Sequence, residues 1–211
     1  NHKSHDLNHP RVEALIRELS QLMGPNAKPA MFEEMFTDLA LIGLEHQDLG
    51  DHKLIHKALA ELRESMEMFL PHRGKRKVAV FGSSRISDSH PNYKLALELA
   101  EGLVRHDYQV ITGAGGGIMQ AANQGAGPGN SFGLNIKLPL EQSANPFIAN
   151  NPNLLEFKYF FTRKLVFIKE SSATVLLPGG LGTLDEGFEN LTLFQTGKCM
   201  PRPIILLDHK D

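Results

Sequence analysis

From residue 78 onward the chain alternates short apolar runs with stretches of helical periodicity, and this alternation limits the possible folds most. The runs predict buried strands, and the stretches between them predict helices. Strands separated by helices form βαβ units, which build a parallel sheet with right-handed crossovers. We therefore predict an α/β fold with a Rossmann-like open parallel sheet flanked by helices. The predicted strands are 78–82, 108–112, 131–136, 154–158, 173–177 and 203–207, and the predicted helices are 92–105, 117–123, 162–170 and 183–195.

The first 70 residues have a different pattern, which predicts helices alone. Apolar residues between Val12 and Leu22 recur at helical spacing, and similar patterns follow over 31–49 and 54–69. A basic connector with Pro and Gly separates this part from the first strand. The predicted domains are an N-terminal helical extension, residues 1–73, and an α/β domain, residues 74–211. The last predicted strand would normally be covered by another helix, so either a C-terminal segment is missing or the N-terminal helices replace it.

Composition excludes several classes of protein. The chain has 211 residues, of which 41% are hydrophobic and 22% charged, as is ordinary for a soluble globular protein. Its formal net charge of −2 gives no electrostatic reason to expect nucleic acid or an anionic membrane as a partner. No apolar run approaches the roughly 20 residues of a membrane span, and no signal peptide opens the chain. A single cysteine, Cys199, excludes an internal disulfide, so we expect a cytoplasmic location.

Three polar or Gly-rich turns directly follow predicted strands, at 82–84, 113–117 and 179–183. Ligands of open α/β sheets bind outside the carboxyl ends of the strands. We therefore expect the three turns to converge on one crevice.

The turn at 179–183 predicts a site for an anion. Its glycines keep Cβ atoms away from the first turn of the following helix, where N–H groups lack partners and the macrodipole is positive. Thr183 adds a hydroxyl group, and together these features form a phosphate cradle. Glu186 follows one turn into the helix, close to whatever the phosphate carries.

The turn at 113–117 does not fit a dinucleotide fingerprint. Ile118 stands where the third glycine is required, and Lys137 stands where a ribose-binding acid is expected. No P-loop motif is present either. Taken alone, this run of glycines also fits a tight turn between a strand and a helix.

Charged residues near two predicted helix starts have two explanations each. Arg163 and Lys164 fall in a predicted first turn, where the dipole disfavours each cation by about 0.3–1 kcal/mol. Either both side chains are solvated and tolerate this penalty, or Arg163 faces an anionic ligand. Asp185 and Glu186 would complement the dipole of their helix, so their presence alone is weak evidence for catalysis.

His52 and His56 are four residues apart on a predicted helix, a spacing that can hold a metal ion. No third ligand and no HExxH pattern accompanies them. We therefore predict a surface face and no metal site.

The segment PGGLGTLDE at 178–186 matches the PGGxGTxxE signature of the LOG family. These are cytokinin-activating phosphoribohydrolases, which are often labelled "putative lysine decarboxylase". The resemblance extends to the segment that ends in Arg163 and Lys164, and it spans roughly residues 78–208. Further matching segments are 81–84, 113–119 and 134–142.

The resemblance implies a nucleotide-binding catalytic domain over 74–211. It implies hydrolysis of the N-glycosidic bond of purine nucleoside 5′-monophosphates, either AMP or cytokinin-type, which releases the free base and ribose 5-phosphate. It gives catalytic roles to Glu186, beside the ribose, and to Arg163, which positions the substrate. The residues expected to bind substrate and phosphate are Gly82, Ser83, Gly115, Gly116, Gly117, Met119, Lys164, Gly179, Gly180, Gly182 and Thr183.

The resemblance implies no metal and no organic cofactor, and no lysine lies in a recognisable pyridoxal phosphate context. It also implies a homo-oligomer with a dimer as its basic unit. Four consecutive apolar residues, Leu165 to Ile168, agree with this, because they cover more than the one stripe needed to pack on a sheet.

A protein of another class, a non-catalytic carrier or sensor of a nucleotide or a molybdenum-cofactor-like ligand, is the alternative. The presence of both Arg163 and Glu186 favours the enzyme. The sequence leaves open whether the base is adenine or prenylated adenine, and what the N-terminal helices do.

Overall fold

A computed structural model describes residues 9–23, 28–45, 48–138 and 143–209. The chain divides into two compact units, Asn1–Lys57 and Ala58–Asp211. The division falls inside a helix, whereas the sequence predicts a boundary near residue 74. The helices that begin the chain are α1 (Pro10–Leu22), α2 (Pro29–Glu45) and α3 (Leu49–Phe69), followed by a short 3-10 helix, η1 (Leu70–His72).

The first unit contains α1, α2 and the beginning of α3. α1 packs on α2 and buries Ile16 and Ser20, and Arg17 Nε lies 3.5 Å from Glu33 Oε1. Both partners of this ion pair are largely exposed, so it contributes little to stability.

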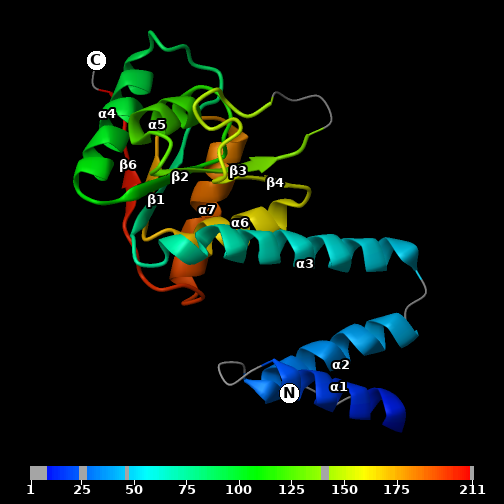
Figure 1. Cartoon of the computed structure of the whole chain (residues 1–211). Helices are drawn as coiled ribbons and strands as arrows, with labels where there is room; N and C mark the ends of the chain where they lie inside the picture. Colours follow the sequence, from blue (N-terminus) through cyan, green and yellow to red (C-terminus); the bar gives the residue numbers. More distant parts are fainter. Residues whose placement is uncertain (1–8, 24–27, 46–47, 139–142, 210–211) are drawn as a thin grey trace. The chain divides into compact units, whose positions relative to one another are not determined.

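The second unit holds the predicted α/β fold, which the structure confirms (Figure 1). In the described residues, six parallel strands form one sheet in the order β4-β3-β2-β1-β5-β6. Every strand and helix predicted from residue 78 onward is present, with ends shifted by a few residues at most. The strands are β1 (Lys77–Phe81), β2 (Gln109–Thr112), β3 (Ser131–Ile136), β4 (Leu154–Phe157), β5 (Ala173–Leu176) and β6 (Ile204–Leu206), and the helices are α4 (Pro91–Arg105), α5 (Ile118–Ala126), α6 (Phe160–Glu170) and α7 (Leu181–Gln195).

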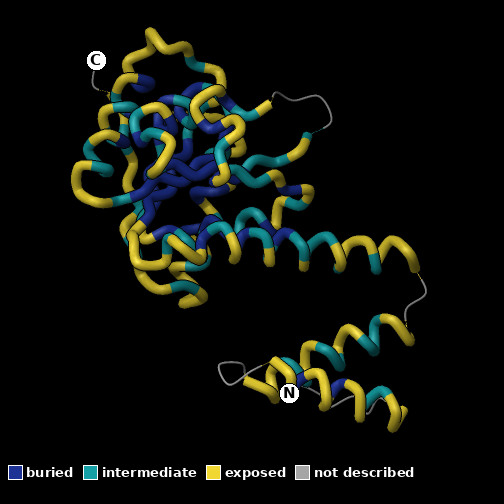
Figure 2. Tube along the Cα trace, viewed as in Figure 1, coloured by how far each residue is buried: buried dark blue, intermediate teal, exposed yellow. Residues whose placement is uncertain are grey.

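The central strands are buried on both faces, as is typical of parallel sheets (Figure 2). Successive residues of a strand point to opposite faces, so β1 contributes to two cores. Val78 and Val80 pack with α4 and α5 on one face. Ala79 and Phe81 pack on the other with Phe167 of α6 and with Phe69 at the end of α3. The second half of α3 thus belongs to the α/β unit, which explains why the division falls within this helix.

The strand order reverses at β1, because β2 pairs with one edge of β1 and β5 with the other. The chain therefore leaves β1 and β5 toward opposite faces of the sheet. In open α/β sheets this switch point opens a crevice at the carboxyl ends of the two strands.

Two helices begin earlier than the sequence predicts. α6 starts at Phe160 rather than Thr162, and α7 starts at Leu181 rather than Thr183. Aromatic residues and glycine have low helix propensity, so local preference places both starts too late. In α7 the carbonyl of Gly180 already accepts a hydrogen bond from the N–H of Thr183, which closes the first turn. In the part of the chain that is described, no helix is long and apolar enough to cross a membrane.

Candidate active site

The three turns meet at the switch point, as predicted from the strand ends. The N–H of Ser83 donates to the carbonyl oxygen of Pro178 at 3.0 Å, which joins the turns after β1 and β5. The N–H of Ile118 donates to the carbonyl oxygen of Ser83 at 2.9 Å, which joins the turn after β2. The hydrogen bonds of one residue, Ser83, thus hold all three turns at one crevice.

Close approach between backbones explains several of the glycines here. A Cβ added to Gly117 would lie 2.2 Å from the carbonyl oxygen of Ser83, and Gly117 has φ 59°. A Cβ on Gly82 would lie 2.6 Å from Cγ1 of Ile118, and one on Gly116 would lie 3.0 Å from the carbonyl oxygen of Ser84. Side chains at these positions would push the turns apart.

The side chain of Met119 lies over the turn that follows β2. A Cβ added to Gly115 would lie 2.6 Å from Met119 Cε, and one on Gly113 would lie 2.9 Å from Met119 Sδ. The same Cβ on Gly113 would lie 3.8 Å from Arg163 Nη1. Arg163 of α6 therefore reaches the carboxyl end of β2, next to Met119.

Asn145 fixes the backbone of this turn by side-chain hydrogen bonds, a role that no sequence motif predicts. Its Nδ2 donates to the carbonyl oxygens of Ala114 and Gly115, each at 3.0 Å, and it lies 2.9 Å from Asn123 Oδ1. The hydroxyl of Thr112 also donates to Asn123 Oδ1, and it accepts a hydrogen bond from the N–H of Ala114. The network holds Ala114 at φ 62°, a conformation that is uncommon outside glycine. The sequence signal, Asn followed by Pro, marks a turn but not what the side chain binds.

The turn at 179–183 is open on one side. A Cβ added to Gly180 or Gly182 would meet nothing within 4 Å, whereas one on Gly179 would lie 2.2 Å from Thr183 Oγ1. Thr183 is thus folded against Gly179. The backbone of Gly180 and Gly182 is free of side-chain cover at the N-terminus of α7, which suits an approaching anion.

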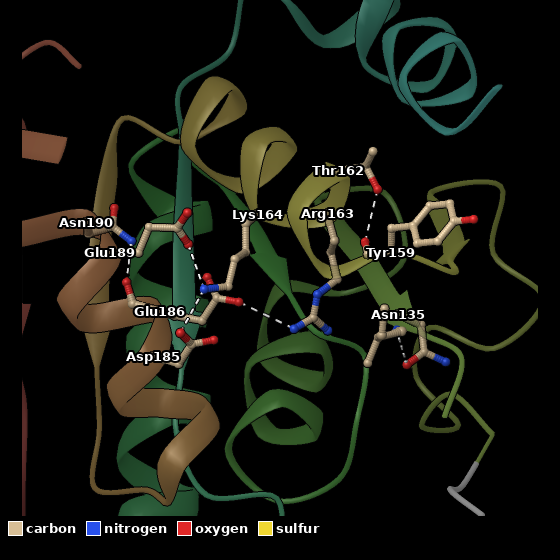
Figure 3. Close-up of polar contacts among 10 residues, drawn as sticks. Asn135, Tyr159, Thr162, Arg163, Lys164, Asp185, Glu186, Glu189 and Asn190 are labelled. Carbon is tan, nitrogen blue, oxygen red and sulfur yellow. Dashed lines mark hydrogen bonds and ion pairs between the residues drawn. The ribbon is translucent and has the colours of Figure 1, made fainter. Parts of the chain in front are cut away.

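Arg163 of α6 and Glu186 of α7 form a buried ion pair (Figure 3). Arg163 Nη2 donates to Glu186 Oε1 at 3.3 Å, and their side chains are 13% and 4% exposed. The guanidinium also lies 5.3 Å and 5.8 Å from the ring centroids of Phe160 and Phe167. Among the described residues, Arg163 Nε and Glu186 Oε2 are buried without a hydrogen-bond partner. Such groups are costly in a native protein, so the pair has hydrogen-bonding capacity left for a ligand.

Burial governs the electrostatics of this pair. It raises the pKa of Glu186 above its ordinary value, although Arg163 and Lys164 act to lower it. Burial likewise lowers the pKa of Arg163, against the opposing effect of Glu186. Shifts in these directions, caused by burial next to a charged partner, are common at functional sites.

The early helix starts change the interpretation of the charged residues. Arg163 is the fourth residue of α6, Glu186 is the sixth of α7, and the first turn of α7 contains no acid. Dipole effects decline within the first turn. The sequence argument that the dipole of α7 explains Asp185 and Glu186 is therefore wrong. Arg163 ends the first turn of α6, as predicted, and Lys164 lies just beyond it.

Lys164 faces the acids of α7. Its Nζ lies 2.8 Å from Asp185 Oδ1 and 2.9 Å from Glu189 Oε2 (Figure 3). Burial alone would lower the pKa of Lys164, but hydrogen bonds to these two carboxylates raise it above its ordinary value. Lys164 thus joins α6 to α7, and its contact with a ligand stays a prediction. In the described ranges, no group of three or more His, Cys, Asp or Glu side chains is placed to hold a metal ion.

The part of the chain that carries Arg163 and Glu186 is similar to known proteins. Residues 117–211 match the family model described as "Possible lysine decarboxylase". Over 137 residues the chain is 28% identical to a protein of Arabidopsis thaliana named "Probable cytokinin riboside 5′-monophosphate phosphoribohydrolase LOG6". This match covers 63% of the chain and 66% of the relative, just under two thirds of the relative's length.

Solved structures of two molybdenum-cofactor proteins are also similar. They are a binding protein from Rippkaea orientalis, 23% identical with a TM-score of 0.47, and a carrier protein from Chlamydomonas reinhardtii, 20% identical with a TM-score of 0.46. Each likeness covers 64% of this chain and 78% of the other. Values this low do not separate an enzyme from a carrier. The family match and the Arabidopsis relative confirm the resemblance to the LOG family that the PGGxGTxxE motif predicts.

Proposed function

We propose that the chain is a phosphoribohydrolase, which cleaves the N-glycosidic bond of purine nucleoside 5′-monophosphates. The observation that carries the proposal is the buried pair of Arg163 and Glu186, which have unused hydrogen-bonding atoms. The name of the Arabidopsis relative supports the substrate class. A carrier needs a cradle for its ligand but has no use for a desolvated carboxylate beside it.

In the proposed mechanism, the turn at 179–183 binds the phosphate and fixes the sugar by remote binding energy. The ribose then lies between this turn and Glu186. As the bond between C1′ and the base nitrogen breaks, its electron pair leaves with the base and the ribose becomes oxocarbenium-like. The carboxylate of Glu186 stabilises this positive charge and accepts a proton from the water whose oxygen bonds to C1′. The departing base takes up a proton from solvent, and Glu186 afterwards releases its proton to solvent, so that the net reaction adds one water.

Arg163 has two roles in this scheme. Its guanidinium orients the carboxylate of Glu186 through the 3.3 Å contact, and its remaining donors are available to the anionic substrate. The guanidinium also lies over the rings of Phe160 and Phe167, which stabilise its position by cation–π attraction. A fixed Arg163 therefore keeps the acid in place for attack at C1′.

Base release is the direct test. The protein is incubated with AMP and with isopentenyladenosine monophosphate, and the free bases are separated by chromatography. Glu186→Gln keeps size and removes charge, so we expect turnover to fall by about 10²–10⁴-fold while nucleotide binding stays measurable. Glu98→Gln, the same change at an exposed position of α4, is the matched control. Turnover like that of the wild type in Glu186→Gln would refute the assignment.

We also propose that the chain acts as a homodimer through the exposed sides of α6 and α7. Val166 and Phe167 are buried in the sheet-facing core, so they explain only half of the apolar run in α6. A two-fold contact would bury the same patch on both copies. Eight apolar side chains of these helices are about half exposed or more: Phe160, Phe161, Leu165, Leu181, Leu184, Phe188, Leu191 and Phe194.

Light scattering at micromolar concentration tests the dimer. We expect a mass about twice that of the 23.4 kDa chain, and we expect Phe188→Lys, which places a charge in the apolar patch, to lower it. An active, monodisperse monomer would contradict the proposal.

A further inference from the structure

Glu61 is a buried carboxylate in the second half of α3, within the α/β unit. Its side chain is only 2% exposed. Oε1 accepts a hydrogen bond from the N–H of Lys158 at 2.6 Å, and Oε2 accepts one from the hydroxyl of Thr162 at 2.5 Å. Both donors belong to the segment that begins α6, about a hundred residues further along the chain.

This carboxylate anchors the start of α6 from outside the helix, at the backbone of Lys158 and the side chain of Thr162. The N-cap residue of α6, Tyr159, makes no side-chain cap hydrogen bond. A helix start has unpaired N–H groups and a positive dipole end, which an acceptor with negative charge stabilises. Glu61 brings negative charge to this end from a neighbouring helix, and it accepts from the N–H of Lys158, one residue before the N-cap. Thr162 is also held from within α6, because its hydroxyl lies 3.0 Å from the carbonyl oxygen of Tyr159 (Figure 3).

The anchored turn is the turn that carries Arg163. Thr162 precedes Arg163 directly, and the N–H of Arg163 donates to the carbonyl oxygen of Tyr159 at 3.4 Å. A shift of this turn would move the guanidinium relative to Glu186, which belongs to another helix. The contact between the two charges, at 3.3 Å, leaves little room for such a shift.

The other end of α6 is anchored separately. Arg202 Nη1 donates to the carbonyl oxygens of Ile168 at 2.6 Å and Ser171 at 2.9 Å. Arg202 Nη2 donates to Asn190 Oδ1, and Asn190 Nδ2 donates to the carbonyl oxygen of Glu186 at 2.7 Å. The C-terminal end of α6 is thus tied to α7. Nearer the N-terminal end, Lys164 also contacts α7, and Glu61 is the anchor from α3.

We propose that Glu61 is a positioning residue, which fixes the first turn of α6 and so holds Arg163 beside Glu186. The kinetic part of this inference rests on the proposed function. This positioning role connects the second half of α3 to the candidate active site. It also explains why a carboxylate is buried at a position where an apolar residue would pack without desolvation cost.

Three variants test the anchor. Glu61→Ala removes both acceptors, and we expect kcat to fall on the order of tenfold to a hundredfold while KM changes by less than about threefold. Glu61→Gln can still accept from Lys158 and meet the hydroxyl of Thr162, so it should stay within about threefold of the wild type. Thr162→Val removes one of the two contacts and should lower kcat by about three- to tenfold, which keeps the test possible if Glu61→Ala does not fold. Glu67→Gln, on the exposed face of α3, is the matched control.

A double-mutant cycle separates positioning from general loss of stability. If Glu61 acts through Arg163, then Glu61→Ala should lower kcat by less than about threefold in an Arg163→Ala background. Thr162→Val is combined with Arg163→Ala in the same way. The same fold loss in both backgrounds would overturn the proposal, because a merely structural role does not depend on the side chain at 163.

Hydrogen exchange provides a readout without catalysis. The peptide covering residues 158–163 should exchange at least about tenfold faster in Glu61→Ala than in the wild type, while peptides of α4 remain unchanged. Unchanged exchange at 158–163 would overturn the anchor. If the wild type binds AMP but releases no base, the proposed function fails. The Kd for AMP is then measured in the same set of Glu61 and Arg163 variants, and it decides whether Glu61 positions Arg163.

Discussion

The two glycine-rich turns that enter α5 and α7 look alike in sequence, but Gly180 and Gly182 of the second turn meet different surroundings from the glycines of the first. In the turn at 113–117, an added Cβ on Gly117 would collide with the carbonyl oxygen of Ser83 at 2.2 Å. In the turn at 179–183, an added Cβ on Gly180 or Gly182 would meet nothing within 4 Å. The chain itself requires the first kind of glycine, whereas it gives no packing reason for the second kind.

The difference shows how a glycine motif is to be interpreted. A glycine in close contact with its own chain reports on the fold, because any side chain there would force the backbone apart. A glycine that faces open space at a helix N-terminus suggests an external reason, and an anion that approaches the backbone is the simplest one. The proposed phosphate site rests on glycines of this second kind.

The largest effect that this comparison predicts is at Gly117. We expect Gly117→Ala to lower the free energy of unfolding by about 2–5 kcal/mol, because it combines a positive φ with a backbone collision. Gly127→Ala is the matched control, since Gly127 has φ 72° but no atom within 4 Å of an added Cβ. Urea unfolding measures both variants. Equal losses would mean that the contact with Ser83 is unimportant.

At Gly182 we expect a substitution to weaken the use of AMP as a substrate and to leave the free energy of unfolding nearly unchanged. Gly182→Leu should raise the KM for AMP on the order of tenfold to a hundredfold, because the side chain would occupy the phosphate approach. The free energy of unfolding should stay within about 1 kcal/mol of the wild type, since leucine has the higher helix propensity. Gly129→Leu, at another glycine with open surroundings, is the control.

The phosphate argument also predicts that AMP is cleaved far better than adenosine by the wild type. Gly182→Leu should then leave the slow cleavage of adenosine unchanged. Comparable rates on the two substrates would instead indicate a nucleoside hydrolase, and the turn at 179–183 would lose its proposed role.

The smallest effect concerns the stability cost of the buried acid. Because the pKa of Glu186 is raised, the folded state binds more protons than the unfolded state between the unfolded value of about 4.3 and the raised folded value. The free energy of unfolding therefore falls as the pH rises through this window. Arg163 and Lys164 reduce the shift, whereas Asp185 and Glu189 increase it.

Glu186→Gln lacks this titration. Its free energy of unfolding, relative to the wild type, should increase from pH 4 to pH 7, by about 1.4 kcal/mol for each unit by which the pKa is raised. Thermal and urea unfolding across this range measure the difference. A difference that stays constant or shrinks with rising pH would show that the folded chain does not favour the protonated acid.

The sequence predicts the strands and helices of the α/β unit because each has a local signature, such as the β-branched run of β5 or the periodicity of α4. It also predicts that the three turns converge, since strand direction fixes where strand ends lie. It does not predict the contacts of Asn145 with Ala114, or of Glu61 with Thr162. These are single polar contacts between segments far apart in the chain, and no spacing rule encodes them.

From the order of the strands we also expect the crevice to form late in folding. β1, β2, β3 and β4 are neighbours both along the chain and in the sheet, so they can pair one after another during synthesis. The other edge of β1 must wait for β5, which places Val78 opposite Ala173. Closing so long a loop has a higher entropic cost than joining successive strands. Until it closes, Ser83 has no Pro178 to bind, and an incomplete chain presents an open apolar strand edge that other chains can pair with.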